Sequence, residues 1–197
     1  MTALLQGLLM PFQIWNDTVL KIGRGIAIVA VGLMVVAILI QVFFRYVLNN
    51  ALPWPDEAAR FAMLWMTGLV APTAYRRGGF VAIDMLVWML PPRLGALLSL
   101  FLLVIATIVL AIALPIGWNE VTGFGGKFAT ASLYLPTSLD FTEFFRVPRS
   151  WMMTSLLVGV VLLLIVNIEL ILRALIALLG GAEDLRPIPG ADTVEAE

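Results

Sequence analysis

The charged residues that could do chemistry or recognise a partner are concentrated in one stretch, residues 45–86. Within it Asp56, Glu57 and Arg60 are spaced so that a helix would bring all three to one face. The chain contains no histidine and no cysteine, which excludes His-ligated metals and His-based relays. No set of catalytic roles can be assembled from the acids that remain. We therefore expect no enzyme activity, cofactor or metal, and we interpret these charges as recognition or anchoring residues.

The composition is that of a membrane protein. Of the 197 residues, 61% are apolar and 13% are charged, whereas soluble domains carry about 45–50% apolar and about 25% charged residues. The net charge of −1 gives no basic field that would attract nucleic acid. Without cysteine there are no disulfides, and the redox compartment stays open.

Four segments are expected to form transmembrane helices. Residues 25–44 form a run of 20 uncharged residues, the length needed to cross about 30 Å of hydrocarbon. Between Arg60 and Arg76 there are only 15 uncharged residues, so the second helix must begin earlier, near Pro55. A proline followed by acids is a helix start signal there. The expected helices cover about 19–44, 55–75, 94–117 and 150–173.

The sequence thus predicts an all-α membrane protein of four transmembrane helices plus interfacial amphipathic segments. Residues 1–17 are expected to lie in the membrane interface, with an apolar frayed tail as the alternative. The four-helix domain is expected over 18–179, and residues 180–197 are expected to be a polar, disordered tail. The loop over 120–149 is long and aromatic, so we expect it to be packed.

Orientation follows from the distribution of lysine and arginine. Four spans put both termini on one side, together with the middle loop. That side carries seven basic residues and the other carries five; the seven are Lys21, Arg24, Arg76, Arg77, Arg93, Arg173 and Arg186. We expect both termini to be cytoplasmic.

The predicted spans have no ionisable residue at mid-depth, although transporter cores usually have one, or carry helices broken in repeated halves. This favours a helper subunit that packs against a larger protein. One alternative is a self-sufficient small oligomeric four-span exporter. Such a protein usually needs a membrane-embedded acid in its first helix, and residues 25–44 contain none. Others are a membrane enzyme and an adhesion-type four-span protein, which generally carries extracellular cysteines.

The pattern in residues 45–86 resembles the small membrane subunit (DctQ-like) of tripartite ATP-independent periplasmic (TRAP) transporters. The matching residues are Arg45-Tyr46, Asn49, Leu52-Pro53-Trp54, Glu57, Ala59-Arg60, Trp65, Ala74-Tyr75-Arg76-Arg77-Gly78 and Ile83-Asp84. The chain departs from the family pattern at Pro55, where serine is common, and at Phe80, where histidine is common.

The resemblance implies a subunit of a secondary transporter in the bacterial inner membrane. In such systems a periplasmic substrate-binding protein delivers an organic acid, and a large membrane subunit moves it, usually with sodium. The small subunit resembles a scaffold that widens and anchors the large one. The implied partners are the large TRAP membrane subunit, the binding protein and membrane lipids, with no nucleic acid.

Two groups of residues are candidates for these contacts. A partner interface is expected around the start of the second helix; its residues are Arg45, Trp54, Asp56, Glu57 and Arg60. The alternative is that the charged residues are solvated by lipid headgroups and that the tryptophan faces lipid. At its end, interface or lipid anchors are expected at Tyr75, Arg76, Arg77 and Asp84. The two arginines could hold an anionic lipid or act as a topology signal. Asp84 could pair with either arginine or stay unpaired.

Overall fold

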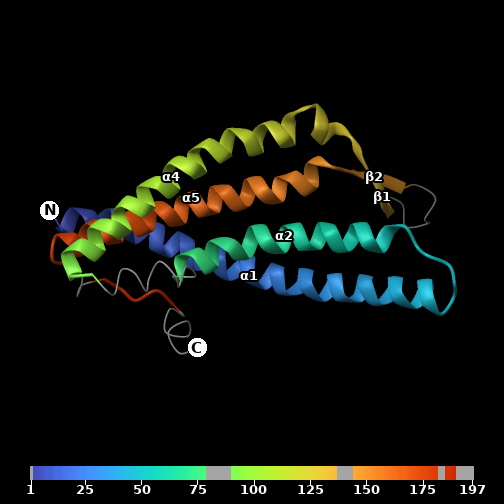
Figure 1. Cartoon of the computed structure of the whole chain (residues 1–197), viewed down its shortest axis with the longest axis horizontal. Helices are drawn as coiled ribbons and strands as arrows, with labels where there is room; N and C mark the ends of the chain where they lie inside the picture. The colour runs from blue at the N-terminus through green and yellow to red at the C-terminus, as the bar shows by residue number, and fades with distance from the viewer. Residues whose placement is uncertain (1, 79–89, 137–143, 182–184, 190–197) are drawn as a thin grey trace.

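The computed structural model describes residues 2–78, 90–136, 144–181 and 185–189. Four long α-helices dominate it (Figure 1): α1 (Thr2–Tyr46), α2 (Trp54–Arg76), α4 (Pro92–Thr122) and α5 (Ser150–Leu178). The start of α1, the start of α4 and the end of α5 lie at one end of the molecule, here called the termini end, and the α1–α2 connection lies at the other. Helix α2 runs from the second end toward the first.

The first helix is longer than the expected 19–44 because α1 continues without interruption from Thr2, with Pro11 inside it. A proline removes one helical hydrogen bond, but burial on either side of it keeps a helical period: Leu9, Gln13, Asn16 and Leu20 are all less than 9% exposed. Packing of this face holds the helix together across Pro11. Whether residues 1–17 lie in the membrane interface stays a prediction.

The helices pack in the order α1, α2, α5, α4, and α1 also contacts α5. A central apolar cluster takes one buried residue from each of three helices, Ala27, Leu69 and Leu162. Among the long helices, α4 packs mainly against α5. The fold therefore encloses α2 and α5 and leaves much of α1 and α4 on the outside.

Helices α2 and α5 cross at two glycines. A Cβ atom on Gly68 would lie 2.4 Å from the carbonyl oxygen of Ser155, and one on Gly159 would lie 3.0 Å from the carbonyl oxygen of Gly68. Gly68 has no room for a side chain, and a side chain at Gly159 would fit only if the facing backbone moved by a few tenths of an ångström. Small residues of this kind let membrane helices approach to backbone contact, where van der Waals packing is strongest.

The expectation of an all-α fold is wrong in the segment between α4 and α5. After the 3-10 helix η1 (Phe124–Lys127), strands β1 (Ala129–Pro136) and β2 (Phe144–Pro148) form an antiparallel hairpin with a bulge between Ala129 and Tyr134. The hairpin contacts α2 and α5, but the described aromatic residues of this segment are exposed and not packed; these are Phe124, Phe128, Tyr134, Phe144 and Phe145. Its local sequence favours strands because it contains aromatic and β-branched residues, and each strand ends on a proline.

Three of the described helices are long and apolar enough to cross a membrane: Leu5–Tyr46, Leu94–Thr122 and Ser150–Leu178. Helix α2 carries Asp56, Glu57 and Arg60 in its first two turns and Arg76 at its end, which lowers its hydropathy. Of the four expected spans, three are therefore long and apolar enough to cross a membrane, and α2 is a fourth helix packed among them. Of the tail expected over 180–197, only residues 180–181 and 185–189 lie within the described part of the chain.

Candidate functional site: polar contacts at the two ends of the bundle

Two charged groups at the termini end of the bundle are buried and paired with each other. Arg76, the last residue of α2, is 5% exposed, and Glu169 of α5 is fully buried. The Arg76 Nε donates to Glu169 Oε2 at 2.8 Å, and Nη2 donates to Oε1 at 2.8 Å. Two parallel hydrogen bonds between a guanidinium and a carboxylate are the strongest geometry for such a pair.

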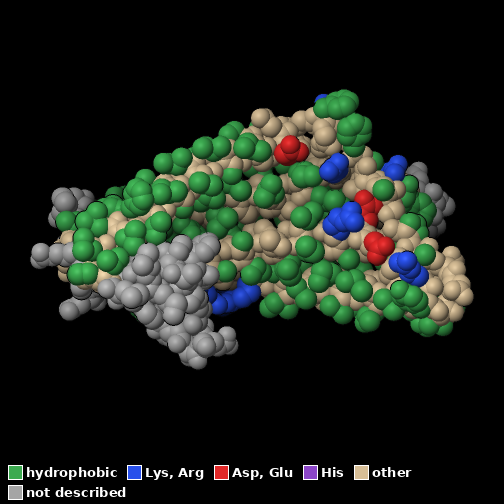
Figure 2. Space-filling view, viewed as in Figure 1, with side chains coloured by type: hydrophobic (Ala, Val, Ile, Leu, Met, Phe, Trp, Pro, Cys, Tyr) green, Lys and Arg blue, Asp and Glu red, His purple; other side chains and the backbone are tan. Residues whose placement is uncertain are grey.

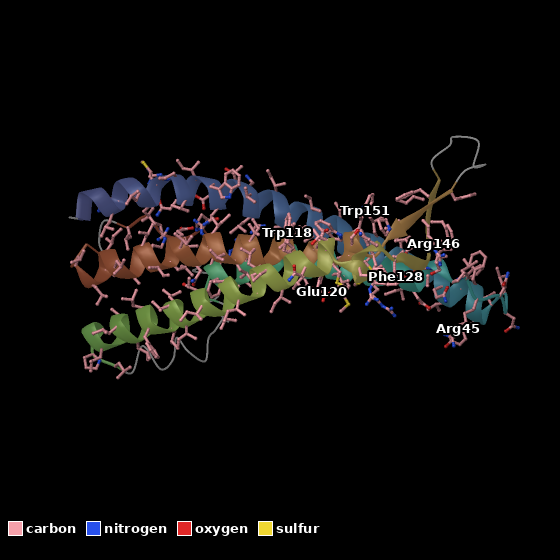
Figure 3. The ribbon with its side chains drawn as sticks, turned by 90° about the horizontal axis from the view of Figure 1, so that it is seen from above. Arg45, Trp118, Glu120, Phe128, Arg146 and Trp151 are labelled. Atoms are coloured by element: carbon pink, nitrogen blue, oxygen red, sulfur yellow. The ribbon has the colours of Figure 1, made fainter. Side chains whose placement is uncertain are left out.

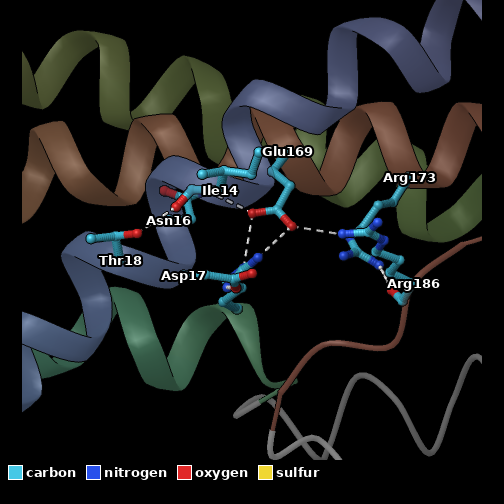
Figure 4. Close-up of polar contacts among 8 residues, drawn as sticks. Ile14, Asn16, Asp17, Thr18, Glu169, Arg173 and Arg186 are labelled. Carbon is cyan, nitrogen blue, oxygen red and sulfur yellow. Dashed lines mark hydrogen bonds and ion pairs between the residues drawn. The ribbon is translucent and has the colours of Figure 1, made fainter.

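Three more side chains complete this group (Figure 4). Asn16 Nδ2 donates to Glu169 Oε2 at 2.6 Å, and Arg173 Nε donates to Oε1 at 3.1 Å. The third Arg76 nitrogen, Nη1, pairs with Asp17 Oδ1. We call Asn16, Asp17, Arg76, Glu169 and Arg173 the charged cluster. Its two arginines balance its two acids, and it joins α1, α2 and α5.

A second set of polar contacts adjoins the charged cluster, because Tyr75 and Asn167 lie one and two positions before Arg76 and Glu169 in the sequence. The Tyr75 hydroxyl donates to Asn167 Oδ1, and Asn167 Nδ2 donates to Thr107 Oγ1 at 2.7 Å and to the Leu103 carbonyl at 3.1 Å. Asn167 is fully buried. These contacts join α2 and α5 to α4, so all four long helices are linked by polar side chains near the termini end.

At the opposite end, Glu57 holds the hairpin on α2. Its carboxylate accepts the backbone N–H of Ala131 at 2.9 Å and that of Ser132. The Ser132 hydroxyl oxygen lies 2.7 Å from both Glu57 Oε2 and the Pro53 carbonyl, so its single hydrogen serves one of them at a time. The first turn of α2 thereby satisfies amides that the bulged strand cannot pair.

Arg146 of β2 satisfies the carbonyls of the same bulge. Its Nε donates to the Thr130 carbonyl at 2.6 Å, and Nη2 donates to the Ala131 carbonyl at 2.8 Å. The guanidinium carbon also lies 5.5 Å from the centre of the Tyr134 ring, a cation–π distance. Arg146 and Trp151 lie where the hairpin meets the bundle (Figure 3).

The remaining residues of the expected partner interface have fewer contacts. Asp56 Oδ2 accepts a hydrogen bond of 3.3 Å from Gln41 of α1. Arg45 and Arg60 are exposed and form no ion pair with any described residue. Trp54 is 40% exposed and lines an apolar hollow of about 370 Å³ between α1, α2 and the hairpin.

The expected anchors at the end of α2 are separated by the fold. Tyr75 and Arg76 both point into the bundle. Arg76 was expected to face lipid headgroups, but it is bound to acidic side chains of the same chain. Arg77 is the C-cap of α2 and is partly exposed. Asp84 lies outside the described residues. Sequence reasoning did not find the role of Glu169, although a glutamate four residues before Arg173 in an apolar helix was a signal for it.

The outer surface contrasts with these interior contacts. Hydrophobic side chains cover much of the visible face of α4 and of α1 (Figure 2), and charged side chains gather toward the hairpin end. Among the described residues no group of three His, Cys, Asp or Glu side chains could hold a metal ion. The fold and its polar contacts define a multi-helix membrane protein that uses its buried polar groups to join its own helices.

A comparison with known protein families identifies the family of this membrane protein. The family model for the DctQ component of tripartite ATP-independent periplasmic transporters matches residues 34–177. The chain belongs to this family, which confirms the resemblance found in residues 45–86 and makes it a membrane component of a transporter. No curated protein and no solved structure matches the chain.

Proposed function

We propose that the chain is the scaffold subunit of a TRAP transporter and packs against the large membrane subunit. The complex would take up an organic acid, coupled to sodium, from a periplasmic binding protein. The observation that carries this proposal is that the buried charges pair with one another: Arg76 and Glu169 bind each other within the chain and are not available to a solute. A membrane protein that moves a charged solute needs polar groups left available to it.

We propose α2 as a fourth span. Glu57 and Arg76 are 19 positions apart, which corresponds to roughly 28 Å of helix and is close to the 30 Å or so of the hydrocarbon layer. The charges of α2 would then sit at the two membrane surfaces. Arg60, one turn inward and exposed, could extend its guanidinium back toward the surface.

Four spans would place both termini on one side, which we propose is the cytoplasmic side of the inner membrane. The seven basic residues predicted for that side outnumber the five on the other, in accord with the distribution of lysine and arginine in membrane proteins. The hairpin and the exposed Arg45 and Arg60 would then face the periplasm, where the binding protein docks.

The exposed apolar faces of α1 and α4 are the proposed contact surfaces for lipid and for the large subunit. An extensive apolar surface is ordinary for a lipid-facing helix, and it also suits an obligate partner. The hollow beside Trp54, with Trp151 on its wall, offers a concave site for side chains of a partner helix at the periplasmic end.

The test is co-expression with a large TRAP membrane subunit from the same genome, followed by purification through a tag on this chain alone. We expect a stable one-to-one complex, and we expect uptake of solute to be lost when this chain is deleted. The control is this chain expressed alone and placed in liposomes. A homo-oligomer that moves solute by itself would contradict the scaffold proposal and favour the small four-span exporter.

A further inference from the structure

A polar hollow of about 350 Å³ lies at the termini end, between α1, the end of α2 and the C-terminal segment. Lys21 and Arg24 of α1 line it, together with Thr73 and Arg77 of α2 and with Ile188 and Pro189. Lys21 and Arg24 are three residues apart and therefore share one face of α1. Basic side chains are visible on the α1 side of the molecule toward this end (Figure 2).

The charges around this hollow do not balance. In the charged cluster, Arg76 and Arg173 are neutralised by Asp17 and Glu169, which leaves a net charge of zero. Lys21, Arg24 and Arg77 form no ion pair with any acid of the described residues. Asp17 and Arg76 also line the hollow, but they pair with each other. Three cations therefore face the hollow without an ion-pair partner among the described residues.

A hydroxyl without a partner also lines the hollow. Thr73 Oγ1 is buried and forms no hydrogen bond in the described structure. The other threonines described inside helices bond the carbonyl four residues earlier, at 2.8–2.9 Å; these are Thr18, Thr67, Thr107, Thr122 and Thr154. The Thr73 hydroxyl can therefore donate to a bound group.

We infer that this hollow binds the phosphate of an anionic phospholipid headgroup. Lys21, Arg24 and Arg77 supply the positive charge, and Thr73 donates a hydrogen bond to a phosphate oxygen. Lys21 and Arg24 directly precede the uncharged run 25–44, so the hollow lies at the depth of the headgroups. Arg76 lines the hollow but is held by Glu169, so its role is to fix the wall and not to bind the lipid.

The test is lipid binding by the full-length chain in detergent, measured by native mass spectrometry with phosphatidylglycerol and with phosphatidylcholine. The double variant Arg24→Gln/Arg77→Gln is compared with Lys127→Gln/Arg149→Gln, which removes the same charge at the hairpin end. We expect the first variant to bind phosphatidylglycerol about 25-fold more weakly, at about fivefold for each cation, and the second to bind as the parent does. Phosphatidylcholine should bind weakly to all three.

Thr73→Val keeps the charge and the shape, and it should weaken phosphatidylglycerol binding about tenfold, as expected for the loss of a hydrogen bond to a charged group. Equal losses in both double variants would mean that binding follows overall charge, and the inference would be overturned. Inorganic phosphate is the second ligand tested. If it displaced the lipid at micromolar concentration, a soluble phosphate and not a headgroup would be the ligand.

Discussion

Arg76 of α2 and Glu169 of α5 are 93 positions apart in the sequence, and they meet through two hydrogen bonds of 2.8 Å in the interior of the bundle. Glu169 is fully buried, and it also accepts from Asn16 and Arg173. A carboxylate in this position is tolerated only because each of its oxygens is matched by donors. The charged cluster therefore fixes how α1, α2 and α5 are arranged.

Replacing Glu169 with glutamine should destabilise the fold strongly. Arg76 and Arg173 would lose their buried counter-charge, and breaking one side of a buried ion pair typically costs about 3–5 kcal/mol. The measurement is the free energy of unfolding in detergent with a chemical denaturant. Replacing both members, as in Arg76→Met/Glu169→Met, should recover part of the loss because neither member of the buried pair then remains without the other. Asp17 and Arg173 lose a partner in this variant, but both are more exposed than Arg76 and Glu169. Arg77→Met is the control and should be nearly neutral. A loss of stability for Arg77→Met as large as that for Glu169→Gln would contradict the burial of the pair.

Tyr75→Phe should have a much smaller effect. It removes only the hydroxyl that donates to Asn167, and hydrogen bonds between membrane helices contribute about 0.6 kcal/mol on average. Asn167→Leu should cost more, since it also removes both bonds to α4. The same unfolding measurement gives both values, and the order of the two variants is the test: a Tyr75→Phe loss as large as that of Asn167→Leu would show that the hydroxyl carries the whole contact.

Glu57→Ala should release the hairpin without unfolding the helices. The amides of Ala131 and Ser132 would lose their acceptor, and hydrogen bonds to a charged group contribute about 1.5–3 kcal/mol. Hydrogen exchange in the β1 segment should therefore become about 10- to 100-fold faster, while exchange in α5 stays unchanged. Asp56→Ala is the matched control, because its only described partner is Gln41. Unchanged exchange in β1 would show that Glu57 does not hold the strand.

Gly68→Val should disrupt the crossing of α2 and α5. The new Cβ would lie 2.4 Å from a backbone oxygen that cannot move away without shifting α5, and overpacking of this kind typically costs about 1–3 kcal/mol or more. The control is Gly32→Val on α1, where a Cβ meets nothing within 4 Å. Stability in detergent and recovery of the complex with the large subunit are the measurements. A Gly68 variant as stable as the Gly32 variant would mean that the two helices are not in backbone contact.

The hairpin illustrates a limit of local sequence signals. The aromatic residues of 120–149 predicted a packed segment, yet those that the structure describes are exposed. The strands depend on polar contacts between residues distant in the sequence: Glu57 of α2 binds the amides of the bulge, and Arg146 of β2 binds its carbonyls. Glu57 was expected in a partner interface, and it has a partner within the chain. Whether it also contacts another subunit stays a prediction.

The sequence by itself determined that this is a helical membrane protein of the DctQ family, because hydropathy and the motif in residues 45–86 are local properties that the chain carries into any fold. Only the tertiary structure decided how the charges are used. Arg76 and Arg77 are adjacent and look equivalent in the sequence, yet one is bound to Glu169 in the interior and the other faces a hollow. Their difference depends on the direction each side chain takes from the end of α2 and on residues brought there by α1 and α5, which no local pattern encodes.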